Sequence, residues 1–554
     1  MAKTRPSKKP VRPQAPATPE PTARRWGEID VIALVAATLC AVLAYLSRLV
    51  LSPDGVSYLD LTGAMANGDW HRFVQGYWSP LFPFVMGLVS MGTGFTGSSL
   101  VPAAHVMSAL AAIAGIGILW YWGRAVTVTR PLFGRLAIAA FLLCSAGLPK
   151  IEAVTPDVVS LLLAVAISYQ LLVHGGRRWL LTGLLLGAAF LAKTSAWPWL
   201  LVAVPLRIWA APDAPARRNV WMSTATCAVV MLTWIVPMSV KAGHPTLGSS
   251  GRLNWSWYID GTRRTQTPDG DTGAHAAYTS VPLVNGQQVT VATFDDAEHW
   301  TYQPWGDPTA WAENAAPNND RGATIGELTG FWLKMFGNVF GLWLLPMIVL
   351  TIVPAFVLHH RPGLWGEAKT RNRDAVVVAA IGLTGLFQFV IIHPEPRLIA
   401  PLAIMLTLGT LWWFTSAPAE PAERIALPIR RVLSWLGMIA ALGFAMPTFK
   451  KGIESDARLA ETSARLDLLR SRLATVVTGT PTIAVVGPAA PILSAAYWSG
   501  VHVAMQIPPR SLEALSGLTT EQRDAALKAI FGGKVPMLWK TSADGGVEML
   551  VVPR

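Results

Sequence analysis

The first apolar stretch of the chain, IDVIALVAATLCAVLAYLSRLV at residues 29–50, leads directly into a polar loop that opens SPDGVSYLD at 52–60. A membrane-crossing helix needs about 20 predominantly apolar residues, which this stretch supplies. It is too long for the apolar core of a signal peptide, and no small-residue cleavage site follows it. The stretch therefore predicts a retained membrane-spanning helix.

The composition of the whole chain agrees with a membrane-embedded fold. Of 554 residues, 52% are hydrophobic and 14% charged, with a mean hydropathy of +0.40, whereas soluble domains carry about 25% charged residues. The net charge of +12 arises mainly in short loops and an N-terminal tail. This distribution favours orientation in a bilayer over nucleic-acid binding. The three cysteines lie in apolar runs, so no disulfide framework is predicted.

Further apolar runs predict an α-helical polytopic membrane protein with about eleven transmembrane helices. After the first run, they fall at about 101–122, 133–148, 156–173, 179–192, 196–210, 219–240, 330–357, 375–392, 397–415 and 432–448. The run 80–92 is too short to cross and is expected at the interface. The short pair that meets at Lys193 also admits a broken or re-entrant arrangement.

Basic residues set the predicted orientation and domain plan. The tail at 1–28 is rich in Pro, Ala, Lys and Arg, which predicts a disordered cytoplasmic segment. The arginine clusters between later spans fall on the same side, so the loops 51–100 and 241–329 of a module at 29–448 are expected outside. The predicted location is the inner (plasma) membrane, with a cytoplasmic N-terminus.

The C-terminal residues 449–554 predict a small extracytoplasmic α/β domain. An opening amphipathic helix carries Leu459, Leu466 and Leu473, and strand-like and helical segments follow. These segments are TIAVVG at 482–487, VHVAMQI at 501–507, a helix near 519–531 and VEMLVV at 547–552. The VVGPAAP turn lacks Gly-x-Gly-x-x-Gly spacing, so no nucleotide site is predicted.

The first external loop holds the carboxylate of greatest interest. A helix beginning at Gly55 would place Asp54 at its cap and Tyr58 one turn along. Two interpretations of Asp54 remain open, a simple N-cap and a general base at the membrane boundary. For Asp60 and Asp69, a solvated helix face and a turn are favoured.

Several motifs accompany that loop. An aromatic–alanine helix, a Gly-Asp-Trp turn and a Pro-Leu-Phe segment follow Asp54, and three further stretches are KIEAVTPD at 150–157, GAAFLAKTSAWPWLL at 187–201 and HPEPRLIAPL at 393–402. Together they resemble the GT-C superfamily of integral-membrane glycosyltransferases, over about 30–440. The likeness is strongest to the branch with protein O-mannosyltransferases and lipid A aminoarabinose transferases. One departure is Asp54-Gly55, where the mannosyltransferase branch often has an acidic pair, so the substrate is not carried over.

The resemblance implies transfer of a sugar from a polyprenyl-phosphate donor, with Asp54 as the general base. It also implies that Lys193, Arg397 and His393 contact the donor phosphate at the external headgroup level. The alternatives are snorkelling to the interface for the two longer cations and a structural or solvated role for the histidine.

A second acidic position is expected to serve the acceptor. Asp157 starts a span after Pro156, where it either caps the helix dipole or orients the acceptor together with Tyr58 and Glu152. It could also join Asp54 in holding a divalent cation. No cofactor is assigned, and no His/Cys cluster has metal-ligand spacing, so no structural metal is predicted.

The large loop carries many aromatic residues. Trp255, Trp257, Tyr258, Trp300, Tyr302, Trp305 and Trp311 lie there. They fit either an interfacial aromatic belt or a mobile cover that stacks on sugar rings.

The resemblance, together with acids and cations expected on the same membrane face, predicts an inverting membrane glycosyltransferase that moves a sugar to a hydroxyl of a cell-envelope lipid, glycan or protein. The expected partners are the polyprenyl-phosphate donor, the acceptor and the bilayer, without nucleic acid. A transporter or flippase of lipid-linked saccharides is the alternative, although the chain shows no repeat between its halves. A glycan polymerase or ligase is a third.

Overall fold

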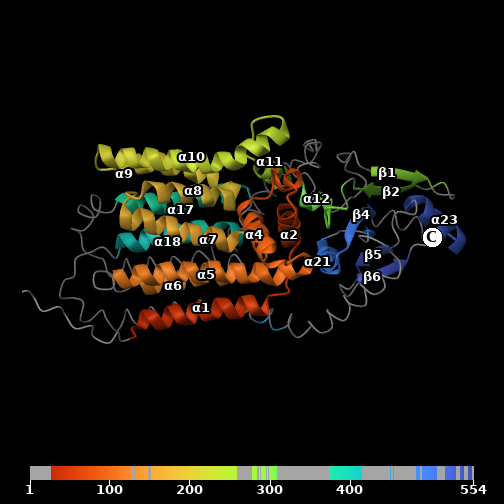
Figure 1. The fold of residues 1–554 in the computed structure, drawn as a ribbon, viewed down its shortest axis with the longest axis horizontal. Helices are drawn as coiled ribbons and strands as arrows, with labels where there is room; N and C mark the ends of the chain where they lie inside the picture. Colours follow the sequence, from red (N-terminus) through yellow and green to blue (C-terminus); the bar gives the residue numbers. More distant parts are fainter. Residues whose placement is uncertain are drawn as a thin grey trace, which may run out of the picture.

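A computed structural model of the chain describes residues 26–126, 133–147, 151, 153–258, 278–282, 286, 288–294, 296, 298–308, 373–392, 395–414, 450, 453, 482–486, 490–507, 518–531, 537–541 and 547–551. A bundle of long helices forms one end of the molecule, and a mixed sheet forms the other (Figure 1). The predicted runs 330–357 and 432–448 and the leucine-heptad helix lie outside the described residues.

The described apolar runs become helices that lie side by side in the bundle (Figure 1). They are α1 (Glu28–Leu46), α5 (Leu100–Ala125), α6 (Phe133–Leu142), α7 (Asp157–His174), α8 (Trp179–Ala192), α9 (Trp197–Ala210), α10 (Ala214–Ala242), α17 (Arg373–Ile392) and α18 (Pro396–Phe414). Within the described residues, four helical stretches are long and apolar enough to cross a membrane, namely Glu28–Leu46, Gly97–Ala125, Asp157–His174 and Ala214–Ala242. Shorter apolar helices stand beside them, which indicates an integral membrane protein.

Glycines let neighbouring helices approach closely in the bundle. A Cβ atom at Gly382 of α17 would lie 2.6 Å from the backbone nitrogen of Leu406 in α18. One at Gly183 of α8 would lie 2.5 Å from the carbonyl oxygen of Ser223 in α10. Helices in a bilayer associate by close packing of this kind, so these positions depend on the lack of a side chain.

The loop that follows α1 folds into short helices at the end of the bundle. It forms α2 (Pro53–Ala66), α3 (Trp70–Phe73) and α4 (Leu81–Thr93). α2 begins two residues before the Gly55 start expected from the sequence, because Ser52 caps it by accepting the Gly55 N–H at 3.1 Å. Pro53 then occupies the first helical turn, where its missing N–H costs nothing.

The sheet combines strands of the loop at 241–329 with strands of the C-terminal residues. Within the described residues its strands run in the order β1-β2-β4-β3-β5-β6. They are β1 (Tyr278–Pro282), β2 (Gln288–Thr293), β3 (Thr482–Val486), β4 (His502–Ile507), β5 (Met537–Thr541) and β6 (Val547–Val551), with β3 parallel to both β4 and β5. The helices α21 (Ala490–Ser499) and α23 (Thr520–Phe531) accompany them.

The join between loop and C-terminal residues lies at β2 and β4. The two strands pair antiparallel, with Ala292 opposite Gln506 and Thr293 opposite Met505. The segments expected as strands at 482–487, 501–507 and 547–552 form β3, β4 and β6. The loop strands β1 and β2, and β5, were not expected from the sequence.

Candidate active site

A cavity of about 620 Å³ lies where the bundle meets α2 and the segments that carry Trp78, Arg252 and Trp305. Its wall includes five residues singled out by the sequence, namely Asp54, Tyr58, Asp157, Lys193 and Arg397. They come from α2, α7, the α8–α9 junction and α18. The fold therefore gathers at one place residues that are far apart along the chain.

Asp54 faces this cavity from the first turn of α2. Because Ser52 caps the helix, the Asp54 carboxylate does not serve as the cap, and the simple capping interpretation is wrong. One oxygen, Oδ1, accepts the indole N–H of Trp305 at 3.2 Å. The other, Oδ2, lies 2.6 Å from Nη1 of Arg397.

Arg397 bridges two carboxylates at the start of α18. Its Nη1 atom contacts Asp54, and its Nε atom lies 2.7 Å from Oε1 of Glu395. Only about a quarter of its side chain is exposed, at 27%. Glu395 was not selected from the sequence, although an acid two positions before an arginine in HPEPRL was the available signal.

Lys193 and Asp157 form a second ion pair on the cavity wall. Asp157, at the N-terminus of α7, is 1% exposed, and its Oδ2 atom also accepts the Thr155 hydroxyl at 2.6 Å. Lys193 stands at the break between α8 and α9, next to a short 3₁₀ turn at Thr194–Ala196. The break suspected from the sequence is thus where the lysine enters the cavity.

Tyr58 lies one turn along α2 and is 5% exposed. Burial raises the pKa of Tyr58 well above its ordinary value, and the charges of Asp157 and Asp54 raise it further. Its ring packs edge-on against Trp78, with centroids 5.0 Å apart. The hydroxyl therefore stays protonated at neutral pH.

Trp305 is another cavity residue that the sequence did not assign to the site. It is 6% exposed, and its neighbours Trp300 and Tyr302 are also buried. All three side chains are therefore packed inside the folded structure. Trp305 and Asp54 are 251 residues apart along the chain, so no local sequence pattern could predict their contact.

Two predicted site residues, Glu152 and His393, lie outside the described residues. In the described part of the chain, no group of three or more His, Cys, Asp and Glu side chains has a metal-binding arrangement. Each of the carboxylates Asp54 and Asp157 faces a side-chain cation.

The charges on the wall set what the cavity can do. The carboxylates of Asp54, Asp157 and Glu395 face the cations of Lys193 and Arg397, and Arg252 also lines the wall. A phosphate entering this space competes with the carboxylates for the two paired cations. When a phosphate binds one of these cations, the carboxylate that was paired with the cation is released.

The helical bundle, mixed sheet and charged cavity define a polytopic membrane protein with a polar site at one end of the bundle. The structure is similar to the crystal structure of ArnT from Cupriavidus metallidurans bound to undecaprenyl phosphate, with a TM-score of 0.50 and 14% sequence identity. That match covers 95% of this chain and 96% of that chain. The apo structure of ArnT gives a TM-score of 0.49 and 13% identity over 92% and 93% of the two chains.

No protein-family model matches the chain, and no curated protein matches its sequence. ArnT is a GT-C lipid A aminoarabinose transferase, so the resemblance expected from the sequence is confirmed as a likeness of fold. At 14% identity that likeness establishes the fold alone.

Proposed function

We propose that this chain is a GT-C glycosyltransferase that moves a sugar from a polyprenyl-phosphate donor to a hydroxyl of a cell-envelope acceptor. The observation that carries the proposal is the meeting of Asp54, Asp157, Lys193 and Arg397 on one cavity wall. The ArnT-like fold supports it, and that relative was crystallised with undecaprenyl phosphate.

In the proposed reaction Asp54 acts as general base. It takes the proton of the acceptor hydroxyl, whose oxygen attacks the anomeric carbon of the donor sugar. The bond from that carbon to the phosphate oxygen breaks, and polyprenyl phosphate leaves with the electron pair. Attack opposite the leaving group inverts the anomeric centre.

Two cations are proposed to receive the phosphate. Arg397 and Lys193 are held by carboxylates at the cavity wall, so they are oriented before the donor arrives. Preoriented cations stabilise charge that develops on a leaving group without reorganising during the reaction. When phosphate displaces Asp54 from Arg397, the second carboxylate, Glu395, keeps the arginine in place and Asp54 becomes free to accept a proton.

The remaining predicted residues keep their proposed roles. Asp157, Tyr58 and Glu152 are assigned to the acceptor, and His393 to the donor phosphate. Asp157 additionally holds Lys193, so its removal is expected to affect the donor side as well.

The proposed topology has about eleven spans, a cytoplasmic N-terminus and an external C-terminal domain at 449–554. The support is the placement of the arginine clusters along the sequence. The cavity then lies at the external headgroup level, where the phosphate of a lipid-linked sugar resides.

The test is transfer by the purified protein in vesicles that contain a labelled polyprenyl-phosphate sugar and a total envelope-lipid acceptor fraction. Asp54→Asn is expected to lower turnover about 1,000-fold or more, because it removes the base. The matched control is Asp69→Asn, since Asp69 lies on the same external loop but caps α3 by accepting the Arg72 N–H, a role that Asn also fills. Movement of intact labelled lipid across the vesicle, without a new glycoside, would support the flippase and refute the transferase.

A further inference from the structure

A short segment at residues 299–307 lies between α2 and the external sheet. At its inner end, the Trp305 indole donates to the Asp54 carboxylate at 3.2 Å. An indole N–H donates only, so it holds the lone pairs of a carboxylate without competing for a proton. This contact fixes one oxygen of the proposed base.

The backbone around Trp305 is itself anchored to the first external loop. Its carbonyl oxygen accepts the hydroxyl of Ser57 at 3.1 Å and the indole N–H of Trp78 at 3.0 Å. The carbonyl oxygen of the next residue, Gly306, accepts the side-chain amide of Gln75 at 3.4 Å. Two donors on one buried carbonyl leave Trp305 little freedom to turn away from Asp54.

The other side of the segment is tied to strand β4. The Tyr302 hydroxyl donates to Oε1 of Gln506 at 2.6 Å, and the Val503 N–H donates to the carbonyl oxygen of Thr301 at 2.9 Å. Tyr302 and Trp305 are joined through one helical turn, since the Trp305 N–H donates to the Tyr302 carbonyl at 3.1 Å. A continuous chain of contacts thus leads from the sheet to Asp54.

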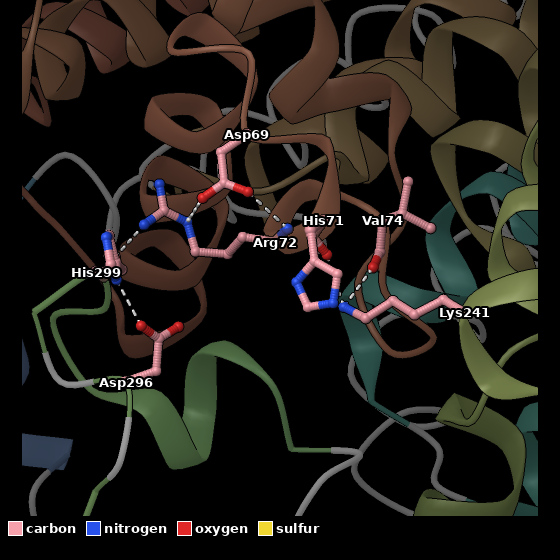
Figure 2. Close-up of polar contacts among 7 residues, drawn as sticks. All are labelled: Asp69, His71, Arg72, Val74, Lys241, Asp296 and His299. Atoms are coloured by element: carbon pink, nitrogen blue, oxygen red, sulfur yellow. Dashed lines mark hydrogen bonds and ion pairs between the residues drawn. The ribbon is translucent and has the colours of Figure 1, made fainter.

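The outer end of the segment is clamped as well (Figure 2). Arg72 donates to the carbonyl oxygen of His299 at 3.1 Å and pairs with Asp69. The Lys241 ammonium, from the end of α10, donates to the carbonyl oxygens of His71 and Val74, both at 2.8 Å. The loop that carries α2 and α3 is therefore fixed to the bundle and to the segment together.

We propose that Trp305 is a positioning residue for Asp54, and that the external sheet holds Trp305 in place through Tyr302 and Gln506. This inference rests on the proposed function, because it assigns the sheet a part in orienting the general base. The sheet is suited to hold Trp305 in place because its strands join the large loop, which contains Trp305, to the C-terminal residues.

The first test is Trp305→Phe in the transfer assay. Phenylalanine keeps a ring beside Trp78, whose centroid is 5.7 Å away, but lacks the donor to Asp54. We expect kcat to fall about 10- to 30-fold while the donor KM changes less than about twofold, since the lost contact orients the base and does not bind donor. An unchanged kcat would refute the positioning role. A fall in kcat accompanied by an equally large loss of donor affinity and by a lower melting temperature would also refute it, because it would indicate general damage to the fold.

The matched control for this variant is Trp539→Phe in β5. Trp539 is fully buried, and among the described residues its indole nitrogen has no hydrogen-bond partner. This substitution makes the same indole-to-phenyl change in the sheet without touching the 299–307 segment. We expect kcat within about twofold of the wild type.

The second test asks whether the sheet acts through Trp305. Tyr302→Phe removes only the hydroxyl that bonds Gln506, and we expect it to lower kcat about threefold in the wild type but not in Trp305→Phe. Additive losses in the two backgrounds would refute the connection.

A spectroscopic test of the same connection does not depend on turnover. The Trp305 indole N–H resonance, assigned by its loss in Trp305→Phe, should shift in Asp54→Asn and in Gln506→Leu. A resonance unmoved by both substitutions would overturn the inference even in an active enzyme. Failure of transfer with the expected shifts would instead count against the proposed function alone.

Discussion

Two carboxylates of one helix, Asp54 and Asp60 of α2, have different surroundings. Asp54 lies in the first turn and pairs with Arg397 on the cavity wall. Asp60 faces the sheet side, where its two oxygens accept the backbone N–H and the hydroxyl of Thr301 at 3.0 and 2.9 Å. Burial raises the pKa of Asp60 to about 7, although the bonds from Thr301 and the charge of Arg72 oppose this.

The difference shows that neighbours from other parts of the chain, and not position on a helix, give an acid its role. The ion pair of Asp54 with Arg397 at the cavity wall fits the role in proton transfer that we propose for Asp54. A carboxylate bonded by neutral groups in a buried place instead links two parts of the fold and titrates near neutral pH. The following predictions test this contrast, from the largest effect to the smallest.

Removing the cation beside Asp54 should have the largest effect. Arg397→Met is expected to lower turnover about 100- to 1,000-fold, because it removes both the partner of Asp54 and a proposed phosphate contact. Transfer rates at saturating donor measure this effect. Arg397→Lys is a useful comparison. Lysine keeps the charge, but its single ammonium nitrogen cannot pair with Asp54 and Glu395 through two separate nitrogens as the guanidinium does. Activity of Arg397→Met near the wild-type level would contradict the assigned role.

The Lys193–Asp157 pair should show a smaller loss of turnover with a clear signature in stability. Lys193→Met is expected to lower transfer about 100-fold and to reduce the melting temperature, because it leaves the buried Asp157 charge without its partner. Adding Asp157→Asn should restore melting temperature but not transfer. Thermal unfolding in detergent and the vesicle assay together decide this. A double variant less stable than Lys193→Met would count against the pairing.

Asp60 should influence the pH dependence of stability more than turnover. Its folded pKa of about 7 lies above the value of about 3.9 for an exposed aspartate, so the folded state binds more protons between these values. Wild-type stability should therefore fall as pH rises from about 4 to about 7. Asp60→Asn, which carries no charge, should flatten that fall while lowering turnover less than about threefold. Identical pH profiles of melting temperature for both proteins would exclude this assignment.

The smallest effect is expected at the clamp formed by Lys241. Its ammonium donates to two backbone carbonyls near the surface, so Lys241→Met should lower the melting temperature by only about 2–4 °C. Differential scanning calorimetry measures this shift. A change larger than that of Lys193→Met would show that the loop carrying α2 and α3 depends on this contact far more than the exposure of Lys241 implies.

The sequence predicted much of the helical part of the fold. Apolar runs such as 156–173 and 179–192 became α7 and α8 nearly residue for residue, because a bilayer demands continuous apolar length. The loop strands β1 and β2 were not predicted, since they are short and lie in a polar loop rich in Gly and Pro. The pairing of β2 with β4 is set by residues about 200 positions later in the chain.

The chain by itself determined the residue types available at the site and the ends of helices where several of them lie. Asp54 after the first span, Lys193 at a break and Arg397 at the start of α18 followed from local patterns. Only the tertiary structure decided which acid faces which cation, and it added Glu395 and Trp305 to the cavity. The physical reason is that apolar length and helix capping act over a few residues. Ion pairs and hydrogen bonds depend on which surfaces the packed helices and sheet bring within about 3 Å of one another.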